Sequence, residues 1–312
     1  MQENLPKAVK GEKLEHFVHT RRFRKNLFLC IMLAIPVIHF FVFWLYVHVS
    51  AFTMAFQNIR GDFIGWDNFK WYFRNLTSDR PSVNMLEAIR NTFIFWSFNL
   101  VVEMPIALVI SYFFYKKIWG YKIYRVLLYL PSILSSVIMV AVFKSFIRSG
   151  GPLDEIVQKL GGNPVPKFLY DSRYAIPTIL VYNLWSGFGS SLILFTGSME
   201  RIPRDVVEYA ILDGIKPFKE LIHIIIPLIW PMISTKLILS VSGLFTSSGP
   251  ILLFTKGEYG TMTVAYSMFQ QVYFYNQTTR AAAIGIIFTL VGVPLVLISR
   301  FILAKVKSTE EY

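Results

Sequence analysis

Long stretches without charged residues restrict the fold of this chain more than any other feature. A helix needs about 20 mostly apolar residues to cross the hydrocarbon layer of a membrane. Six segments of the 312-residue chain meet this requirement. These segments are residues 27–49, 91–115, 126–143, 176–199, 227–255 and 281–299. A soluble fold could not cover this much apolar surface, so the sequence predicts an all-α membrane protein with six transmembrane helices.

The composition supports a membrane protein, because only 16% of the residues are charged, against about 25% in soluble domains. The first apolar segment could instead be a signal peptide. However, it follows a polar tail of 26 residues, and its 23 apolar residues exceed the usual length of a signal core. We therefore expect a retained span. The one cysteine, Cys30, lies in this span and excludes a disulfide framework or a cysteine-rich metal site.

The distribution of basic residues predicts the orientation of the spans. With six spans, the loops and tails on one side carry 18 Lys and Arg in 76 positions, and those on the other side carry 12 in 86. The richer set is 1–26, 116–125, 200–226 and 300–312, and the poorer set is 60–90, 144–173 and 256–280. Because the more basic side is normally cytoplasmic, both termini are predicted to lie inside. The net charge of +12 therefore requires no nucleic-acid partner.

The sequence lacks the motifs with which chains bind nucleotides or catalytic metals. It has no G-x-x-x-x-G-K-[ST] loop, no H-E-x-x-H pair and no cluster of Cys and His. We therefore expect that this chain is not an enzyme and binds no cofactor. If ATP drives its activity, another chain must hydrolyse the ATP.

The polar stretch between the fourth and fifth spans has the pattern of two short helices joined by a glycine. Pro203 suits the first turn of one helix, and Gly214 can take the positive φ angle that ends it. Pro217 suits the start of the second helix, which leads to Pro227 at the entry of span five. We call residues 203–226 the elbow. Neither helix is long enough to be stable alone in water, so the elbow must dock on lipid, on its own bundle or on another protein.

The helical periodicity gives each elbow helix an apolar side. In the first helix this side holds Val206, Val207, Ala210 and Ile211. In the second helix it holds Phe218, Leu221, Ile222 and Ile225, and the polar residues Lys219, Glu220 and His223 are expected to point elsewhere.

The elbow resembles the EAA motif, E-A-A-x3-G-x9-I-x-L-P, of the permease subunits of ABC importers. In this sequence the motif reads Glu208-Tyr209-Ala210, then Gly214, then Ile224, Ile226 and Pro227, with the same spacing throughout. Tyr209 replaces an alanine and Ile226 replaces a leucine. Both replacements keep an apolar residue, so the register of the motif is retained.

The resemblance extends from about residue 27 to residue 304. The segment IGWDNF (64–69) is similar to the G-x-x-N-[FY] turn of sugar-type permeases, and Asn91-Thr92 is similar to the N-T pair at the start of their second span. The segment with Arg125 and Pro131 is similar to their third span. After span five, this chain has T-K-G-E where sugar permeases often have T-x-G-G-P.

This resemblance implies the fold and the partners of a type I ABC importer in the plasma (inner) membrane of a prokaryote. A second permease subunit, expected to be a paralogue, would complete the pathway. Two cytoplasmic ATPase subunits would bind ATP and Mg, and an extracytoplasmic solute-binding protein would deliver the solute. The implied domains are a cytoplasmic basic tail (1–26), the first span with its outer loop (27–87), the transmembrane core (88–304) with the EAA loop at about 200–227, and a cytoplasmic tail (305–312).

In that family the elbow is a coupling helix that sits in a groove of the ATPase. The resemblance implies that Glu208 pairs with a basic ATPase residue, that Ala210 allows close packing and that Gly214 allows the bend. ATPase closure would then tilt spans four and five as a rigid body, a known type of switching movement. The residues implied in coupling are Glu208, Tyr209, Ala210, Asp213, Gly214, Ile224 and Pro227.

Polar groups within the spans are candidates for the substrate pathway. Glu103 is the clearest, because a carboxylate at a helix centre costs about 2.5–3.5 kcal/mol on insertion scales. It should face a cavity, a partner chain or a hydrogen-bond donor, or be protonated, and local polar packing near Pro105 is an equal alternative. Lys236 raises the same question in span five, where a packing role is slightly favoured.

Span four also combines aromatic faces with hydrogen-bonding groups, as the recognition of carbohydrates requires. Tyr and Trp also favour the membrane interface, and small serines often pack helices together, so structural roles stay open. The candidates are Tyr182, Asn183, Trp185, Ser190 and Ser191 in span four and Ser240, Ser242 and Ser247 in span five.

The sequence thus predicts a permease subunit that imports a sugar or an oligosaccharide by alternating access. The same importer class with another cargo, such as a polyamine, a peptide or a phosphorylated compound, is the nearest alternative. An ion-coupled secondary carrier is a further alternative. Carriers of that class commonly have repeated halves and ion sites at the membrane midplane, whereas the elbow and the lone Glu103 argue against one here.

Overall fold

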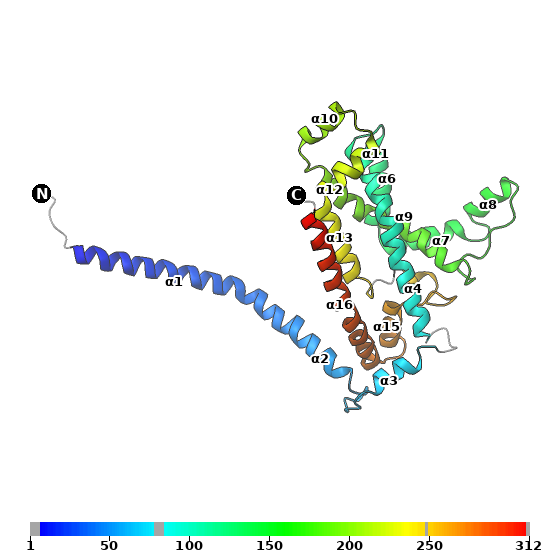
Figure 1. Ribbon diagram of the computed structural model, residues 1–312. Coiled ribbons are helices and arrows are strands. Elements are labelled where there is room, and N and C mark those ends of the chain that lie inside the picture. Colours follow the sequence, from blue (N-terminus) through cyan, green and yellow to red (C-terminus); the bar gives the residue numbers. More distant parts are fainter. Residues whose placement is uncertain (1–6, 78–83, 247–248, 310–312) are drawn as a thin grey trace.

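The computed structural model describes residues 7–77, 84–246 and 249–309. Within these residues the chain is built from helices, and the only extended pairing is an isolated bridge between Gln57 and Phe63. The bundle lies beside a long N-terminal helix that points away from it (Figure 1). The elements are α1 (Lys7–His39), η1 (Phe40–Leu45), α2 (Tyr46–Met54), α3 (Asp67–Arg74), α4 (Met85–Phe98), η3 (Asn99–Glu103), α5 (Met104–Tyr115), α6 (Tyr121–Ile133), α7 (Ser136–Ile147), α8 (Pro152–Lys159), α9 (Ala175–Met199), α10 (Arg204–Leu212), α11 (Pro217–Glu220), η4 (Leu221–Ile225), α12 (Ile226–Leu228), α13 (Trp230–Ser242), α14 (Ile251–Phe254), α15 (Val264–Tyr273) and α16 (Thr278–Thr309).

Six membrane-length elements agree in number with the six predicted spans. Four helical stretches in the described residues are long and apolar enough to cross a membrane, namely Phe23–Met54, Met85–Tyr115, Ala175–Met199 and Thr278–Lys305. Two further candidates are bent pairs of helices, and the count becomes six if each pair is one span. The prediction of an all-α protein with six spans is therefore confirmed, but two of the spans are not straight.

The third predicted span, residues 126–143, is broken, so its prediction as one helix is wrong. Helix α6 ends at Ile133, Leu134 and Ser135 are extended, and the chain continues at an angle of 108° to α6. Pro131 lies inside the last turn of α6 and cannot donate a backbone hydrogen bond. The adjacent Ser135 and Ser136 favour caps and turns over helix interiors, which accounts for the position of the break.

The fifth predicted span, residues 227–255, is also shorter and more bent than expected. Its long helix, α13, ends at Ser242, and the apolar residues beyond it form turns and the short helix α14. The second elbow helix does not stop at Pro227 but continues to Leu228, and a bend of 74° follows at Ile229. Apolar length alone could not distinguish a spanning helix from a shorter helix followed by a folded apolar loop.

Two π-helical turns interrupt the bundle helices, and each ends two residues before a proline. The turn η3 ends at Glu103 and precedes Pro105, and η4 ends at Ile225 and precedes Pro227. A proline ring clashes with the carbonyl four residues earlier. In both cases that carbonyl lies within the wider π turn, where the clash is relieved and the helix continues. Such turns occur often at functional sites.

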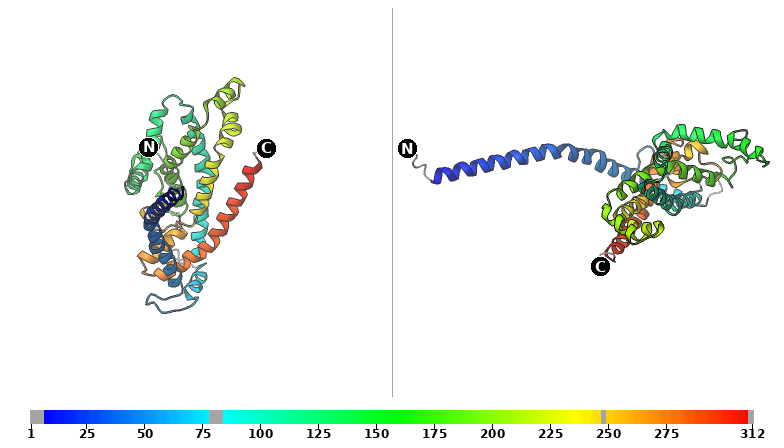
Figure 2. Two further views of the ribbon diagram at one scale, coloured as in Figure 1. Left: turned by 90° about the vertical axis from the view of Figure 1, so that its left-hand side faces the viewer. Right: turned by 90° about the horizontal axis from the view of Figure 1, so that it is seen from above.

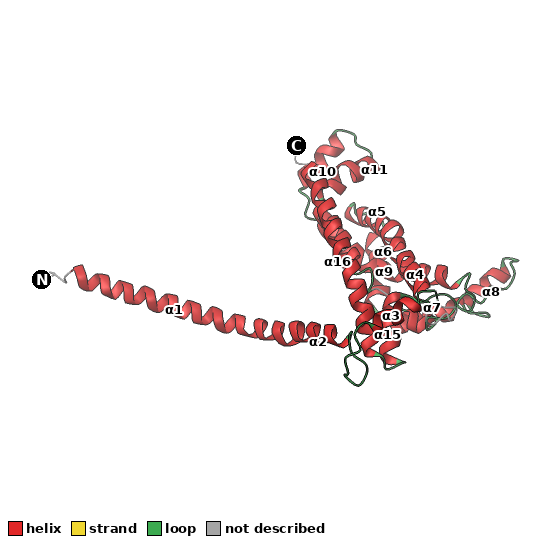
Figure 3. Ribbon diagram, turned by 60° about the horizontal axis from the view of Figure 1, so that its bottom comes forward, coloured by secondary structure: helices red, strands yellow, loops and turns green. Residues whose placement is uncertain are grey.

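The motif residues Asn68, Asn91 and Thr92 hold together the end of the bundle opposite the elbow. The buried Asn68 amide donates to the carbonyls of Ala55 and Gln57 at 2.9 Å each. The Asn91 amide donates to the carbonyls of Gly260 and Met262 at 2.7 and 2.8 Å, and the Thr92 hydroxyl accepts from the Val264 amide at 3.0 Å. These three polar residues therefore have a structural role. They fix the loops at this end of the bundle, where α3 and α15 lie (Figure 3).

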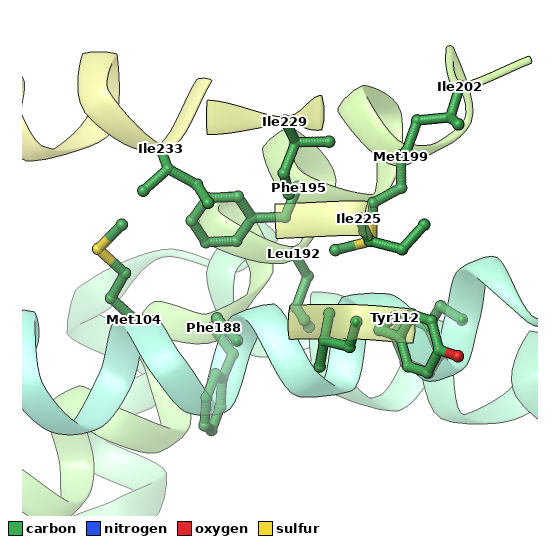
Figure 4. Packing of buried hydrophobic residues seen from close by; sticks show 13 residues of the cluster. Met104, Tyr112, Phe188, Leu192, Phe195, Met199, Ile202, Ile225, Ile229 and Ile233 are labelled. Atoms are coloured by element: carbon green, nitrogen blue, oxygen red, sulfur yellow. The ribbon is translucent and has the colours of Figure 1, made fainter. Parts of the chain in front are cut away.

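The largest apolar core packs α5 and α9 against the second elbow helix and α13. Phe195, Leu192 and Met199 of α9 are fully covered there, and they face Ile225 and Ile229 at the bend (Figure 4). Within a membrane such packing stabilises the bundle through van der Waals contacts between the helices. The elbow is therefore part of the packed bundle and not a loose connection.

Helix α1 and its continuation through η1 and α2 extend away from the bundle, as the right panel of Figure 2 shows from above; in the left panel the same helix is seen nearly end on. The apolar side chains of its membrane-length part are exposed, for example Phe28 at 61% and Ile35 at 76%. Among its described side chains, contact with the bundle lies at the C-terminal end, where α2 packs on α16 and Ala55, just after α2, packs with Phe69 and Ala283. The predicted polar tail, residues 1–26, is helical from Lys7.

The crossing of α6 and α9 requires a glycine at position 189. A Cβ atom added there would overlap Ser132 Oγ and would lie 2.6 Å from the Ser132 Cβ and 3.4 Å from the Tyr129 Cα. We expect Gly189→Ala to lower the stability of the purified chain by about 1–3 kcal/mol, because overpacked contacts force the backbones apart. The matched control is Gly197→Ala on the same helix, where nothing lies within 4 Å of the added Cβ.

Thermal unfolding of the two alanine variants in detergent would check this prediction. The control should be as stable as the parent chain or more stable, since alanine is favoured over glycine inside helices by roughly 0.5–1 kcal/mol. Equal unfolding midpoints for the two variants would contradict the proposed close approach.

Candidate functional site

The elbow has the predicted helix–glycine–helix form. Helix α10 ends where Gly214 takes a φ of +69°, and the amide of Ile215 donates to the Ala210 carbonyl at 3.1 Å. This is the bond that closes a Schellman motif, in which a glycine in the left-handed region follows the helix. Lys216 is extended, and Pro217 then starts α11. The positions of Gly214 and Pro217 in the turn agree with the sequence pattern.

One side of α10 packs on the bundle and the other side is exposed. Val206 and Val207 pack against the large core, and Ala210 is buried. On the opposite side, Tyr209 is 69% exposed and Leu212 is 80% exposed. Glu208 and Asp213 are exposed as well, and the side chain of Ile211 lies outside the described residues. The elbow therefore docks on its own bundle while presenting a second, partly apolar surface.

The second elbow helix is rotated relative to the prediction from periodicity. Leu221 and Ile225 are buried as expected, but Phe218 and Ile222 are 63% and 54% exposed. Glu220, which was expected to point away, is instead only 2% exposed. The apolar arc was wider than the surface that the bundle can cover, so apolar periodicity could not fix the rotation. Ile224 and Pro227 are half-buried.

Glu220 is buried because it forms an ion pair with Lys116 at the end of α5. The Lys116 Nζ lies 2.6 Å from the Glu220 Oε1, and the two side chains are 25% and 3% exposed. The Lys116 ammonium also lies 5.7 Å from the centre of the Tyr112 ring. Sequence reasoning missed this pair, since its members are far apart in the chain and neither occupies a defined position of the EAA motif.

Glu103 and Lys236, which the sequence analysis considered separately, are joined through Ser191. The Ser191 hydroxyl donates to Glu103 Oε1 at 2.7 Å, and Lys236 Nζ donates to Ser191 Oγ at 2.7 Å. The Asn99 amide donates to the second carboxylate oxygen at 2.9 Å. The donors follow one direction, from ammonium to hydroxyl to carboxylate, so each charge is compensated. We call these four residues the polar network.

The polar network borders a cavity of about 320 Å³ between the second span, α9 and α13. Glu103, Asn99, Asn183 and Ser240 supply polar groups to its wall, and Phe95 and Trp96 supply aromatic faces. The Trp96 indole nitrogen is buried and has no hydrogen-bond partner within the described residues. The sequence contains a signal for this wall. Four residues with polar groups are spaced by three or four positions and so lie on one face of a helix, namely Thr92, Trp96, Asn99 and Glu103.

A second cavity of about 760 Å³ lies on the other side of Asn183. Tyr182, Ser190 and Tyr266 contribute to its wall together with Ser132 and Ser136. Tyr266 lies outside the spans, and burial raises the pKa of its hydroxyl, which therefore stays protonated as a donor at neutral pH. Asn183 is the predicted candidate that faces both cavities.

Two other candidates from the sequence, Trp185 and Ser242, do not line these two cavities. Trp185 stacks on Phe143 at 6.1 Å and meets Tyr182 edge to face, in an aromatic cluster. Ser242 donates to the Ile238 carbonyl at 2.9 Å and lines a separate space between α13 and α16. Ser247 lies outside the described residues.

Comparison with known proteins places this geometry in a described family. Residues 72–308 match the family model of the binding-protein-dependent transport system inner membrane component. The arabinooligosaccharides transport system permease protein AraP of Bacillus subtilis is 26% identical over 273 residues, which is 84% of each chain. The maltose/maltodextrin transport system permease protein MalF of Klebsiella aerogenes is 30% identical over 65% of this chain and 40% of that protein.

A solved structure shares the fold. The bacterial alginate ABC transporter in complex with an alginate pentasaccharide-bound periplasmic protein contains a chain that superposes with a TM-score of 0.80. The superposition covers 92% of this chain and 97% of that one, at 20% sequence identity. The bent third and fifth spans therefore lie within a known transmembrane architecture.

Proposed function

The chain belongs to the family of binding-protein-dependent transport system inner membrane components, and from this premise we propose that it imports a sugar or an oligosaccharide as the transmembrane subunit of an ABC importer. Its relatives AraP and MalF are permeases for arabinooligosaccharides and for maltose and maltodextrin. The bundle supplies the pathway and no hydrolytic site is assigned to it. ATP and Mg bind to a partner ATPase.

The observation that carries this proposal is the exposed face of the elbow. The elbow leaves four large apolar side chains more than half exposed within one short segment, namely Tyr209, Leu212, Phe218 and Ile222, and exposed apolar groups gathered in this way are typical of protein–protein contact sites. It lies at the cytoplasmic end of a packed core, beside a carboxylate at Glu208. We propose that this face seats in the ATPase groove and that Glu208 pairs there with a basic residue.

The two cavities around Asn183 support a carbohydrate as the cargo. Sugars present apolar C–H faces edged by hydroxyl groups. The wall of the smaller cavity combines aromatic faces at Trp96 and Phe95 with the amides of Asn99 and Asn183, the Ser240 hydroxyl and the Glu103 carboxylate. The mixture matches such a ligand, since a few placed polar groups within an apolar pocket give orientation and specificity.

The complete transporter comprises four further chains in this proposal. A second permease subunit, a paralogue, faces the cavities, and two ATPase subunits bind the elbows on the cytoplasmic side. An extracytoplasmic solute-binding protein delivers the sugar to the opposite end. The assembly lies in the plasma (inner) membrane of a prokaryote with both termini of this chain in the cytoplasm, in agreement with the excess of basic residues on that side.

Asn183→Ala should reduce ATP-driven uptake about tenfold, which corresponds to the loss of one hydrogen bond of roughly 1.5 kcal/mol to the cargo. The measurement is uptake of radiolabelled maltotriose and arabinotriose into proteoliposomes that hold the complete transporter. Ser242→Ala is the control, since Ser242 lies on α13 but outside both cavities, and its uptake should equal that of the parent chain.

The same assay separates the alternatives. If the parent transporter takes up neither sugar but takes up a polyamine or a peptide with ATP, the cargo is not a carbohydrate and the importer class stands. Uptake driven by an ion gradient in the absence of the ATPase subunits would contradict the importer itself.

A further inference from the structure

The ion pair between Lys116 and Glu220 differs from the other ion pairs of the described residues. Each of the other three leaves at least one side chain more than half exposed, at 62%, 57% and 78%. In the Lys116–Glu220 pair the exposures are 25% and 3%, and the atoms are 2.6 Å apart. It is therefore the one pair here that is both short and largely removed from water.

Stability alone does not explain a buried pair. Burying two charges costs about as much as their attraction returns, and well-packed apolar residues often stabilise a fold equally. Breaking such a pair by removing one partner is costly, because the remaining charge is left buried. A buried pair consequently opposes any separation of the two elements that carry it, because separating them would leave a charge buried without its partner.

The two elements held by this pair are the end of α5 and the second elbow helix. Lys116 is the residue that caps α5, and Glu220 is the last residue of α11 before the π turn η4. A cation at a helix C-terminus is favoured by the helix dipole, but this effect does not account for the burial of Glu220. The ion pair provides that account and connects α5 directly to the elbow.

Helix α5 leads from this ion pair to the wall of the smaller cavity. Glu103 immediately precedes α5, lines the cavity and belongs to the polar network with Ser191 of α9 and Lys236 of α13. The 12 residues of α5 span roughly 18 Å at 1.5 Å per residue. Both ends of this helix are thus fixed by charged groups, one at the elbow and one beside the cavity.

We propose that Lys116 and Glu220 are positioning residues that make α5 move together with the elbow. This inference rests on the proposed function, in which the ATPase displaces the elbow. The displacement then reaches the Glu103 side of the cavity through α5, in addition to the continuous chain connections into α9 and α13. The pair acts on the cavity through α5 and does not touch the cargo.

The test follows the distance between α5 and the elbow during the ATPase cycle. Cys30→Ser gives a chain without cysteine, and spin labels are placed at Trp119→Cys, just beyond α5, and at Ile222→Cys on the elbow. Both positions are exposed, at 91% and 54%. The complete transporter is measured without nucleotide and with ADP and vanadate, by pulsed electron spin resonance.

In the parent complex the distance between the labels should be the same in both states, because the two elements move together. In Lys116→Met/Glu220→Gln, which leaves no unpaired buried charge, the distance should change by about 2 Å or more between the states, the size of a helix shift in switching proteins. The exchanged pair Lys116→Glu/Glu220→Lys should restore the constant distance. Glu200→Gln, in an exposed pair with Arg125 at 3.6 Å, should behave as the parent.

The outcomes distinguish this inference from the proposed function. A distance that changes in the parent complex, or that stays constant in the doubly neutral variant, would overturn the role of the pair alone. A parent chain that fails to co-purify with any ATPase would overturn the proposed function and the inference together. If the doubly neutral variant unfolds at the same temperature as the parent but its label distance changes between the two states, the pair positions the two elements. Such a result cannot come from a general loss of stability.

Discussion

Lys236→Met is expected to destabilise the folded chain by about 1–3 kcal/mol or more, the cost of leaving a buried charged acceptor without the donor that compensates it through Ser191. Glu103 would then lie 2% exposed in a span without its positive charge. The Ser191 hydroxyl and the Asn99 amide would remain as donors, but neither compensates a full charge. Chemical unfolding of the purified complex in detergent measures the change.

The double variant Glu103→Gln/Lys236→Met separates charge from packing. It removes both charges and should recover most of the lost stability, because no buried charge is left. Lys144→Met is the matched control, since this lysine donates only to the Leu253 carbonyl at 3.1 Å and compensates no carboxylate. Two results would contradict this account: Lys236→Met as stable as the parent, or the double variant no more stable than the single one. In either case the charge of Lys236 would not stabilise the charge of Glu103 through the polar network.

Glu208→Lys should weaken binding of the ATPase at least about 30-fold, because losing one partner of an interfacial charge pair costs roughly 2–5 kcal/mol. Glu208 is exposed, so the bundle itself should fold normally. Gly214→Pro should abolish binding as well, since proline fixes φ near −65° whereas Gly214 has a φ of +69°. Co-purification of the tagged permease with its ATPase gives the measurement.

The control for these two variants is Glu155→Lys, an equal change of charge on α8, away from the elbow. It should leave ATPase binding unchanged. Membrane insertion of all three variants should equal that of the parent, as judged by the amount of chain in the membrane fraction. Normal co-purification of Glu208→Lys would remove Glu208 from the coupling contact.

The sequence predicted the elements that depend on local patterns. Apolar length located the spans, and the spacing of Pro203, Gly214 and Pro217 located the elbow turn, because helix ends and glycine turns follow local backbone preferences. Apolar length alone could not place the breaks at Leu134 and Ile229. Pro131, Ser135 and Ser136 are local signals for the first break, whereas the bend at Ile229 lies in an apolar stretch, where tertiary packing decides whether the helix continues straight.

The site was predictable only in part, because long-range contacts have no local signal. Glu103 and Lys236 were recognised as charges that require compensation within the membrane. Their connection through Ser191 depends on how α9 crosses the other two spans, so it became visible only in the fold. Glu220 was placed on the wrong side of its helix for the same reason, since its partner Lys116 lies in a different loop.

Site-specific photocrosslinking of the assembled transporter tests the central claim most directly. A photoreactive residue replaces Leu212 on the exposed face of α10, and the control replaces Phe63 at the opposite end of the bundle, where the side chain is 78% exposed. The account predicts a crosslink from position 212 to the ATPase subunit and none from position 63. A crosslink from position 212 to the solute-binding protein, or the absence of any crosslink to the ATPase, would contradict it.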